Sequence, residues 1–320
     1  MALIGTLAVQ GVQMTLVLVL APWLTGLVRK VKARLLRRRG PPALQPYRDL
    51  WRLMRKEAVL ADNASWLFRA APYLIFAATW VAAALTPTFA TGLTFSWSAD
   101  LIAIIALLGS ARFFLALAGM DVGTSFGGLG SSREVMIASI AEPAMLMVIF
   151  SLALLAGSTQ LSTIAGYMLS SNVGLRITLA LALVALVIVS LAENSRIPVD
   201  NPATHLELTM IHEAMVLEYS GRHLAMIELA AFLKLLFYVS LIACVFVPWG
   251  LAPAGASWPW LLLGSAAYVA KLAVAGVLLA LFETAFAKMR VFRVPAFLSA
   301  AFMTGGLGVL LLFVSRGGLQ

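Results

Sequence analysis

Eight long apolar runs separated by polar segments most constrain what this sequence can fold into. They cover residues 4–27, 71–89, 101–120, 135–156, 177–192, 224–247, 258–281 and 294–314. Each is about 16 to 25 residues long, which as a helix suffices to cross the hydrocarbon core of a bilayer. The runs do not alternate as barrel strands do, so helices are expected. The sequence predicts an all-α integral membrane protein with about eight transmembrane helices.

The composition agrees with this reading. Of the 320 residues, 62% are hydrophobic and 12% are charged, which is more apolar surface than one water-soluble core can bury. We find no internal repeat and no hydrophilic segment long enough for a separate domain. We therefore expect residues 1–320 to form a single polytopic membrane domain, whose first apolar run lacks the flanks of a cleavable signal peptide.

Lysine and arginine fall mainly in every second connection, which predicts the orientation. Twelve of them lie between the first two runs: Arg29, Lys30, Lys32, Arg34, Arg37, Arg38, Arg39, Arg48, Arg52, Arg55, Lys56 and Arg69. Loops rich in these residues stay in the cytoplasm. We therefore expect both termini outside a bacterial inner membrane, with cytoplasmic loops near residues 28–70, 121–134, 193–223 and 282–293. The net charge of +9 is then a topology signal rather than a sign of nucleic-acid binding.

Two of these cytoplasmic loops are long. In the loop at 28–70, an apolar stripe at helical spacing predicts a surface helix that either lies on anionic lipid or docks a soluble subunit. The stripe consists of Tyr47, Leu50, Trp51 and Met54. The loop at 193–223 is acidic, and its carboxylates suit either proton transfer or the binding of a basic partner. These acids are Glu193, Asp200, Glu207, Glu213 and Glu218.

Several ionisable residues lie inside the apolar runs. Arg112, Lys234 and Lys271 fall near the middle of their runs, and Glu142 falls about 10 Å from the cytoplasmic face. Each central charge opposes insertion by roughly 2.5 to 3.5 kcal/mol, so such residues usually pair or line a polar path. One interpretation is ion pairing with Glu142 or Glu228. The other is a proton path through the acids of the cytoplasmic half, which are Glu142, Glu193, Glu228 and Glu283.

Cofactor chemistry is not indicated for this chain. Cys244 is the only cysteine, which excludes iron–sulfur ligation and thiolate-bound zinc within the chain. The three histidines lie in or beside one loop, which does not suit haem ligation between helices. No phosphate-binding glycine loop opens a helix after a strand. We expect no bound cofactor and no catalytic centre, so any redox group would belong to a partner.

One motif carries a family resemblance. Glu193, Arg196, Pro198 and Asp200 stand in the spacing Glu-x-x-Arg-x-Pro-x-Asp, and Glu218-Tyr219-Ser220-Gly221 follows. This order resembles the membrane subunit of respiratory complex I that joins the peripheral arm to the membrane arm. Further motifs are more similar to the formate hydrogenlyase and hydrogenase-4 branch, the group 4 nickel–iron hydrogenases. They are Arg39-Gly40-Pro41, Tyr47-Arg48-Asp49, Arg112-Phe113-Phe114, Gly119-Met120-Asp121, Ser132-Arg133-Glu134 and Glu142-Pro143.

The resemblance implies eight helices and a polar channel that leads from the acidic loop into the membrane. By position, its entrance would be lined by Glu142, Glu193, Arg196, Asp200, Glu207 and Glu218, with Asp121 and Arg133 nearby. It also implies soluble large, small and ferredoxin-like subunits on the cytoplasmic side, holding a nickel–iron centre and iron–sulfur clusters, and antiporter-like membrane subunits. Complex I relatives read Gly-Pro-Asn-Arg where this chain has Gly40-Pro41-Pro42-Ala43, which argues against a quinone pocket.

The sequence thus predicts a membrane-anchoring, proton-channel-like subunit that couples a cytoplasmic redox module to proton or sodium movement. The candidate ion pathway comprises Arg112, Asp121, Arg133, Glu142, Glu193, Arg196, Asp200, Glu207, Glu213, Glu218, Glu228, Lys234, Lys271 and Glu283. Two alternatives remain: the quinone-site subunit of a complex I-like NADH dehydrogenase, and a free-standing secondary transporter. The transporter would commonly show an inverted repeat, which this sequence lacks.

Overall fold

The computed structural model describes residues 2–170, 177–200, 210–253 and 255–317. Its crossing helices are α1 (Ala2–Leu35), α3 (Trp66–Leu85), α4 (Leu101–Asp121), α5 (Ser125–Ala156), α7 (Ile177–Glu193), α9 (Gly221–Phe246), α10 (Trp258–Ala285) and α11 (Val294–Gly317). Seven of them are long and apolar enough to cross a membrane, and α7 is a shorter apolar helix of 17 residues. The prediction of about eight transmembrane helices is confirmed, and the chain is a multi-pass membrane protein.

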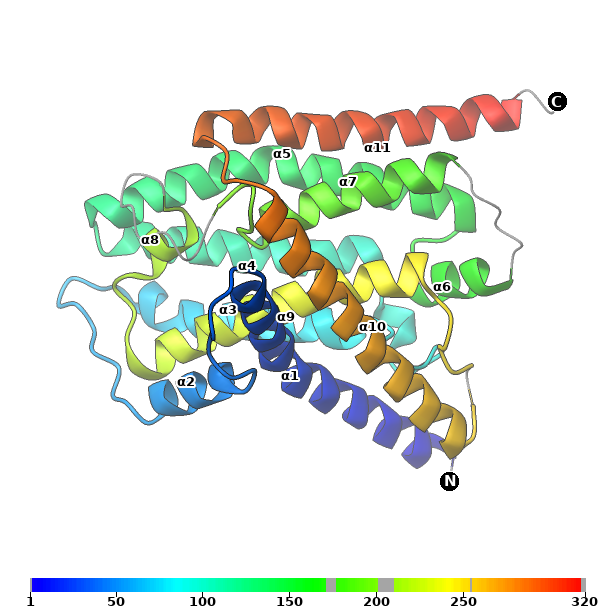
Figure 1. The fold of residues 1–320 in the computed structure, drawn as a ribbon, viewed down its shortest axis with the longest axis horizontal. Helices are drawn as coiled ribbons and strands as arrows, with labels where there is room; N and C mark the ends of the chain where they lie inside the picture. Colours follow the sequence, from blue (N-terminus) through cyan, green and yellow to red (C-terminus); the bar gives the residue numbers. More distant parts are fainter. Residues whose placement is uncertain (1, 171–176, 201–209, 254, 318–320) are drawn as a thin grey trace.

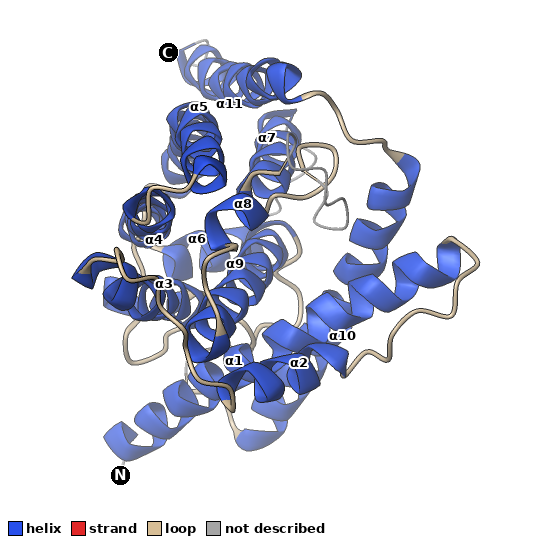
Figure 2. Ribbon diagram, turned by 90° about the vertical axis from the view of Figure 1, so that its left-hand side faces the viewer, coloured by secondary structure: helices blue, strands red, loops and turns tan. Residues whose placement is uncertain are grey.

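The two ends of the bundle differ. In Figure 1, α1 and α10 run obliquely to the remaining long helices, and the start of α1 and the end of α11 lie at the same end, with α6 (Leu161–Ser170). We call this the terminal end. The opposite end, at the left of Figure 1 and facing the viewer in Figure 2, carries α2 (Gln45–Met54) and α8 (His212–Val216). We call it the loop end.

Exposed tryptophans mark both ends. At the terminal end, Trp97, Trp249 and Trp258 are each about two-thirds exposed or more. At the loop end, Trp51 on α2 and Trp66 at the start of α3 are similarly exposed. Tryptophan is enriched where a membrane meets water. The two groups therefore fit the two membrane surfaces, with the long helices between them.

The connection before α5 corrects one prediction. Residues 121–134 were expected to form a cytoplasmic loop, but α5 already begins at Ser125, and only residues 122–124 connect it to α4. Thr124 caps the helix, because its side chain accepts a hydrogen bond from the Gly127 amide. A Cβ on Gly127 would lie only 2.0 Å from the Gly119 carbonyl oxygen. The glycines allow helices α4 and α5 to pack closely here, but in the sequence a glycine-rich segment is typical of a loop.

The surface helix predicted in the first loop is present as α2. Tyr47 and Leu50 face the bundle, where the Tyr47 hydroxyl donates to the Val19 carbonyl of α1. Burial raises the pKa of Tyr47, so this hydroxyl keeps its proton and stays a donor. Trp51 and Met54, the other half of the predicted stripe, are exposed. The stripe is therefore shared between the bundle and an outward-facing surface.

Neutral side chains tie the helices together at the terminal end. Gln13 on α1 is fully buried, and its amide nitrogen donates to the carbonyl oxygens of Ala84 and Thr86, both at 2.8 Å. These carbonyls lie at the end of α3, where a helix leaves its last C=O groups unpaired. On α9 and α10, the hydroxyls of Ser240 and Tyr268 are 2.7 Å apart. The fully buried contacts between helices in this half are therefore hydrogen bonds between uncharged groups.

Candidate functional site

Four charged side chains from four helices meet inside the bundle. Arg112 of α4 lies with its Nε 3.0 Å from a carboxylate oxygen of Glu134 on α5, and its Nη2 contacts Glu193 at the end of α7. Lys234 of α9 places its Nζ 2.9 Å from the same Glu193 oxygen. Arg112, Glu134 and Glu193 are buried. We call these four residues the central cluster.

The central cluster satisfies the electrostatic condition for burial. Its two cations and two anions cancel in formal charge, and each contacts a group of opposite sign. Removing one member would leave a buried charge unpaired, which typically costs about 3 to 5 kcal/mol. Arg112 and Lys234 do form ion pairs with acids, as the ion-pairing interpretation of the sequence predicts. Their partners are Glu134 and Glu193, however, rather than Glu142 or Glu228.

A second set of ion pairs lies where α1 and α10 approach the acidic loop. Glu283 on α10 is buried and accepts from Lys32 of α1 at 2.8 Å and from Arg196 at 3.1 Å. Asp200 pairs with Lys288 at 2.7 Å, and its other oxygen accepts from the Ile211 amide at 3.3 Å. We call these residues the mouth cluster. It joins three segments that lie far apart in the sequence.

Two cavities follow the charged groups. The larger has a volume of about 480 Å³, and its lining includes Glu213, Glu228 and members of the mouth cluster. The smaller has a volume of about 80 Å³ and is lined by all four residues of the central cluster. Asn194, Ser195 and His212 line both cavities, so the two adjoin across these side chains. Either volume is large enough to hold water, given the polar groups in its wall.

A third and smaller cavity leads from the central cluster to Glu142. It holds about 10 Å³ and is lined by Arg112, Glu142, Glu193 and Tyr238 among others. Glu142 lies on α5 and is exposed at the side of the bundle rather than at either end. A Cβ added to Gly109 of α4 would lie 3.4 Å from a Glu142 carboxylate oxygen, so α4 approaches this acid closely. A charged group exposed at this depth requires a polar neighbour.

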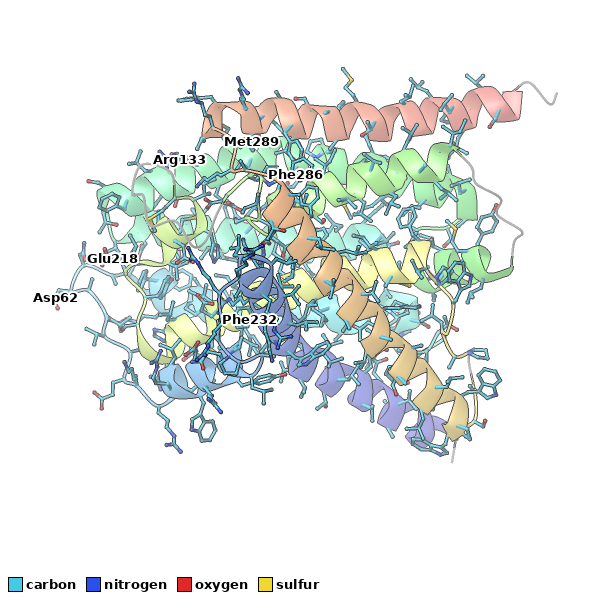
Figure 3. All side chains as sticks on the ribbon, in the orientation of Figure 1. Asp62, Arg133, Glu218, Phe232, Phe286 and Met289 are labelled. Carbon is cyan, nitrogen blue, oxygen red and sulfur yellow. The ribbon has the colours of Figure 1, made fainter. Side chains whose placement is uncertain are left out.

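Several predicted pathway residues lie apart from the two clusters. The Asp121 carboxylate accepts from the Ser65 amide at the start of α3 at 2.8 Å, and Arg133 donates to the Met210 carbonyl at 2.9 Å. Lys271 donates to the Val247 carbonyl at 2.6 Å, just beyond the end of α9. Glu218 is exposed at the loop end, as is Asp62 (Figure 3). Glu207 lies outside the described residues.

The residue after Glu218 shows why this acid lies apart. Tyr219 is buried, and its hydroxyl donates to the Phe68 carbonyl at 3.0 Å. Burial and the nearby Asp121 carboxylate both raise the pKa of Tyr219. With Tyr219 anchored inward on α3, its neighbour Glu218 is held on the surface, beyond the last residue of α8 at Val216.

The sequence reading missed four contributors. The sequence predicts Glu134 in the loop before the fourth run, but α5 begins at Ser125 and already includes it. In the sequence, Lys32 and Lys288 signal only that their loops are cytoplasmic, although both reach acids in the mouth cluster. Tyr238 gave no signal beyond its place in an apolar run. Glu134 could have been found from Thr124, a residue that favours a helix start ten positions upstream.

The described residues contain no group of three or more His, Cys, Asp or Glu side chains that could hold a metal ion. The arrangement supplies carboxylates, cations, a histidine and a tyrosine along adjoining cavities. Such groups can bind, hold and pass protons. The geometry therefore favours ion transfer over bond-making chemistry.

The chain is similar to known proteins. Residues 8–314 match the family described as NADH dehydrogenase. Formate hydrogenlyase subunit 4 of Escherichia coli (strain K12) is 33% identical over 291 residues, covering 91% of this chain and 94% of the relative. Hydrogenase-4 component C of the same organism is 35% identical over 240 residues, or 75% of each chain.

A solved structure has the same fold. It is the membrane-bound sulfane sulfur reductase, an archaeal respiratory membrane complex, one chain of which matches with a TM-score of 0.80 at 20% identity. The match covers 96% of this chain and 99% of that one. The arrangement of helices described above is therefore shared with a subunit of a respiratory complex.

Proposed function

The chain belongs to the NADH dehydrogenase family of membrane proteins, and on that premise we propose that it is the ion-conducting, anchoring subunit of a redox-driven membrane complex. The observation that carries the proposal is the series of adjoining cavities, lined by charged side chains, from the loop end to Glu142. Two relatives, named as parts of formate hydrogenlyase and hydrogenase-4, favour a cytoplasmic module of the group 4 nickel–iron type.

The proposed path begins in the 480 Å³ cavity, where Glu213 and Glu228 collect protons from the loop end. It continues past His212 and Asn194 to Glu193, and from there beside Tyr238 to Glu142. Carboxylates near one another raise each other's proton affinity, which suits groups that must take up and release protons near neutral pH. Arg112 and Lys234 both pair with Glu193, so one of them must withdraw before this carboxylate can take up a proton.

The path leaves the chain sideways. Glu142 is exposed at the flank of the bundle, and the Gln13 and Ser240–Tyr268 contacts of the terminal half are uncharged. We propose that a second membrane subunit, of the antiporter-like kind, covers Glu142 and continues the relay. The redox centres, a nickel–iron site and iron–sulfur clusters, would lie in soluble large, small and ferredoxin-like subunits docked at the loop end.

The orientation belongs to the same proposal. The basic residues of the first loop lie at the loop end, which we assign to the cytoplasm of a bacterial inner membrane. Both chain termini then lie outside. A reporter enzyme that is active only outside the cytoplasm, fused after Gln320, should be active, and a silent fusion would reverse the assignment.

One observation favours a second candidate, the quinone-site subunit of an NADH dehydrogenase. A cavity of about 480 Å³ falls within the size range of small-molecule sites and could admit a quinone ring. Its lining includes Pro41, which directly precedes the two residues that depart from the complex I pattern. Purification through a tag on this chain, with mass spectrometry and a nickel assay, separates the candidates. Nickel with a hydrogenase-like large subunit supports our proposal, and nickel-free dehydrogenase subunits would replace it.

The conduction step has its own test. Glu142→Gln in the assembled complex, reconstituted in sealed vesicles, should slow proton delivery about a hundredfold, because a titratable group in a relay is lost. The ratio of protons moved to electrons transferred should fall accordingly. Glu218→Gln is the matched control, since that acid is exposed at the loop end. A native ratio in Glu142→Gln would contradict the proposed path, and a chain that purifies alone would favour a free-standing transporter.

A further inference from the structure

The connection between α10 and α11, residues 286–293, is basic and carries an aromatic ring that is almost fully exposed to solvent or lipid. Lys288, Arg290 and Arg293 fall within it, and the sequence contains no Asp or Glu from Thr284 to its end. Phe292 is 94% exposed, and Arg290 and Arg293 are also exposed. Neither arginine forms an ion pair with a residue that the structure describes.

This connection is held against the mouth cluster by a hydrogen bond and an ion pair. The Met289 amide donates to the Pro198 carbonyl at 2.9 Å, and Lys288 pairs with Asp200 at 2.7 Å. Phe286 and Met289 lie where the chain turns from α10 toward α11 (Figure 3). The exposed residues Arg290, Phe292 and Arg293 therefore come directly after two residues that are bonded to the acidic loop.

The position of the connection indicates what its exposed residues contact. It joins two helices that cross the membrane, so it lies at the membrane surface, at the loop end (Figure 1). A ring exposed there can enter the boundary between headgroups and acyl chains, while flanking arginines meet phosphate groups. The residues 284–320 hold no acid that would repel an anionic headgroup. Charge complementarity therefore points to lipid phosphate.

We propose that Arg290, Phe292 and Arg293 bind the headgroup of an anionic phospholipid in the leaflet at the loop end. The arginines contact the phosphate, and Phe292 packs against the upper acyl chains. Through Met289 and Lys288, the bound lipid holds in place residues 198–200, which include Asp200 of the mouth cluster. The site is independent of whether the central cluster conducts protons, so its test stands apart from that of the proposed function.

The test uses a photoreactive benzoylphenylalanine at position 292 in the assembled complex, placed in nanodiscs of equal phosphatidylglycerol and phosphatidylcholine. The control carries the same group at Leu310, which is exposed on α11 in the same chain. Each arginine near an anionic surface contributes about fivefold to lipid binding, so the two together predict roughly 25-fold enrichment. Adducts at position 292 should show this excess of phosphatidylglycerol over those at position 310.

The double variant Arg290→Gln/Arg293→Gln should remove the excess, and Arg69→Gln, at an exposed arginine on α3, should leave it unchanged. Both arginines are exposed, so folding is not at risk. Three results would overturn the proposal: the same lipid ratio at positions 292 and 310, an excess that survives the double variant, or crosslinks to a protein subunit in place of lipid.

Discussion

At the loop end of the bundle, buried side chains form ion pairs, whereas at the terminal end the buried polar side chains are neutral. Arg112, Glu193 and Lys234 form ion pairs in the first region. In the second, Gln13 caps the end of α3 through its amide, and the hydroxyls of Ser240 and Tyr268 are hydrogen-bonded to each other. Carboxylates exchange protons readily, but amides and hydroxyls do not. Under the proposed function, the chain carries ions through the half with ion pairs and seals the half with neutral groups.

The largest expected effect comes from breaking the central cluster. Arg112→Met leaves Glu134 and Glu193 without their shared cation, which should lower the free energy of unfolding by about 3 to 5 kcal/mol. Equilibrium unfolding in mixed micelles measures this change. The control is Arg69→Met at an exposed arginine, which should change stability little. Equal stabilities of the two variants would show that the charges are not packed as described.

A smaller effect is expected from the terminal half. Gln13→Leu removes two hydrogen bonds to the end of α3 and should cost about 1 kcal/mol, since such bonds between membrane helices average well under that value each. Proton translocation per electron should be unchanged. Thr15→Val, on the exposed side of the same helix, is the control. A large loss of translocation in Gln13→Leu would erase the contrast between the two halves.

The smallest effect concerns the cap of α4 at the terminal end. The Asp100 carboxylate accepts from the Ile102 amide at 2.8 Å and also from the Thr159 hydroxyl. Asp100→Ala should cost up to about 1 kcal/mol, whereas Asp100→Asn keeps the cap and should cost less. Equilibrium unfolding of the two variants gives these values. A loss in Asp100→Asn as large as that in Asp100→Ala would contradict a capping role.

The cap should also depend on pH. The hydrogen bond from Thr159 lowers the pKa of Asp100 in the folded chain. Its contribution is therefore present above the ordinary aspartate value, about 3.9, and is lost as the pH falls through the lower folded value. The stability gap between the native chain and Asp100→Ala should close in acid. A gap that is constant over this range would assign the effect to packing instead.

The sequence was sufficient for the crossing helices because apolar length alone decides which segments can span a bilayer. The sequence also predicts which charged residues lie within or beside the membrane helices, but it does not predict which of them form ion pairs. Glu193 meets Arg112 and Lys234 only because α4, α7 and α9 pack together, which no spacing within one segment reveals. The start of α5 was misplaced for a related reason. Its first turns are rich in glycine and serine that pack against α4 and α8.

The most direct test of the charged half is to observe a carboxylate change its protonation during turnover. Redox-induced infrared difference spectra of the assembled complex report protonated carboxyl groups. We expect a carboxyl band that is lost in Glu142→Gln and retained in both Glu218→Gln and Gln13→Leu. A spectrum that is identical in Glu142→Gln and the native complex would mean that this acid does not exchange protons, and that the cavities leading to it serve packing alone.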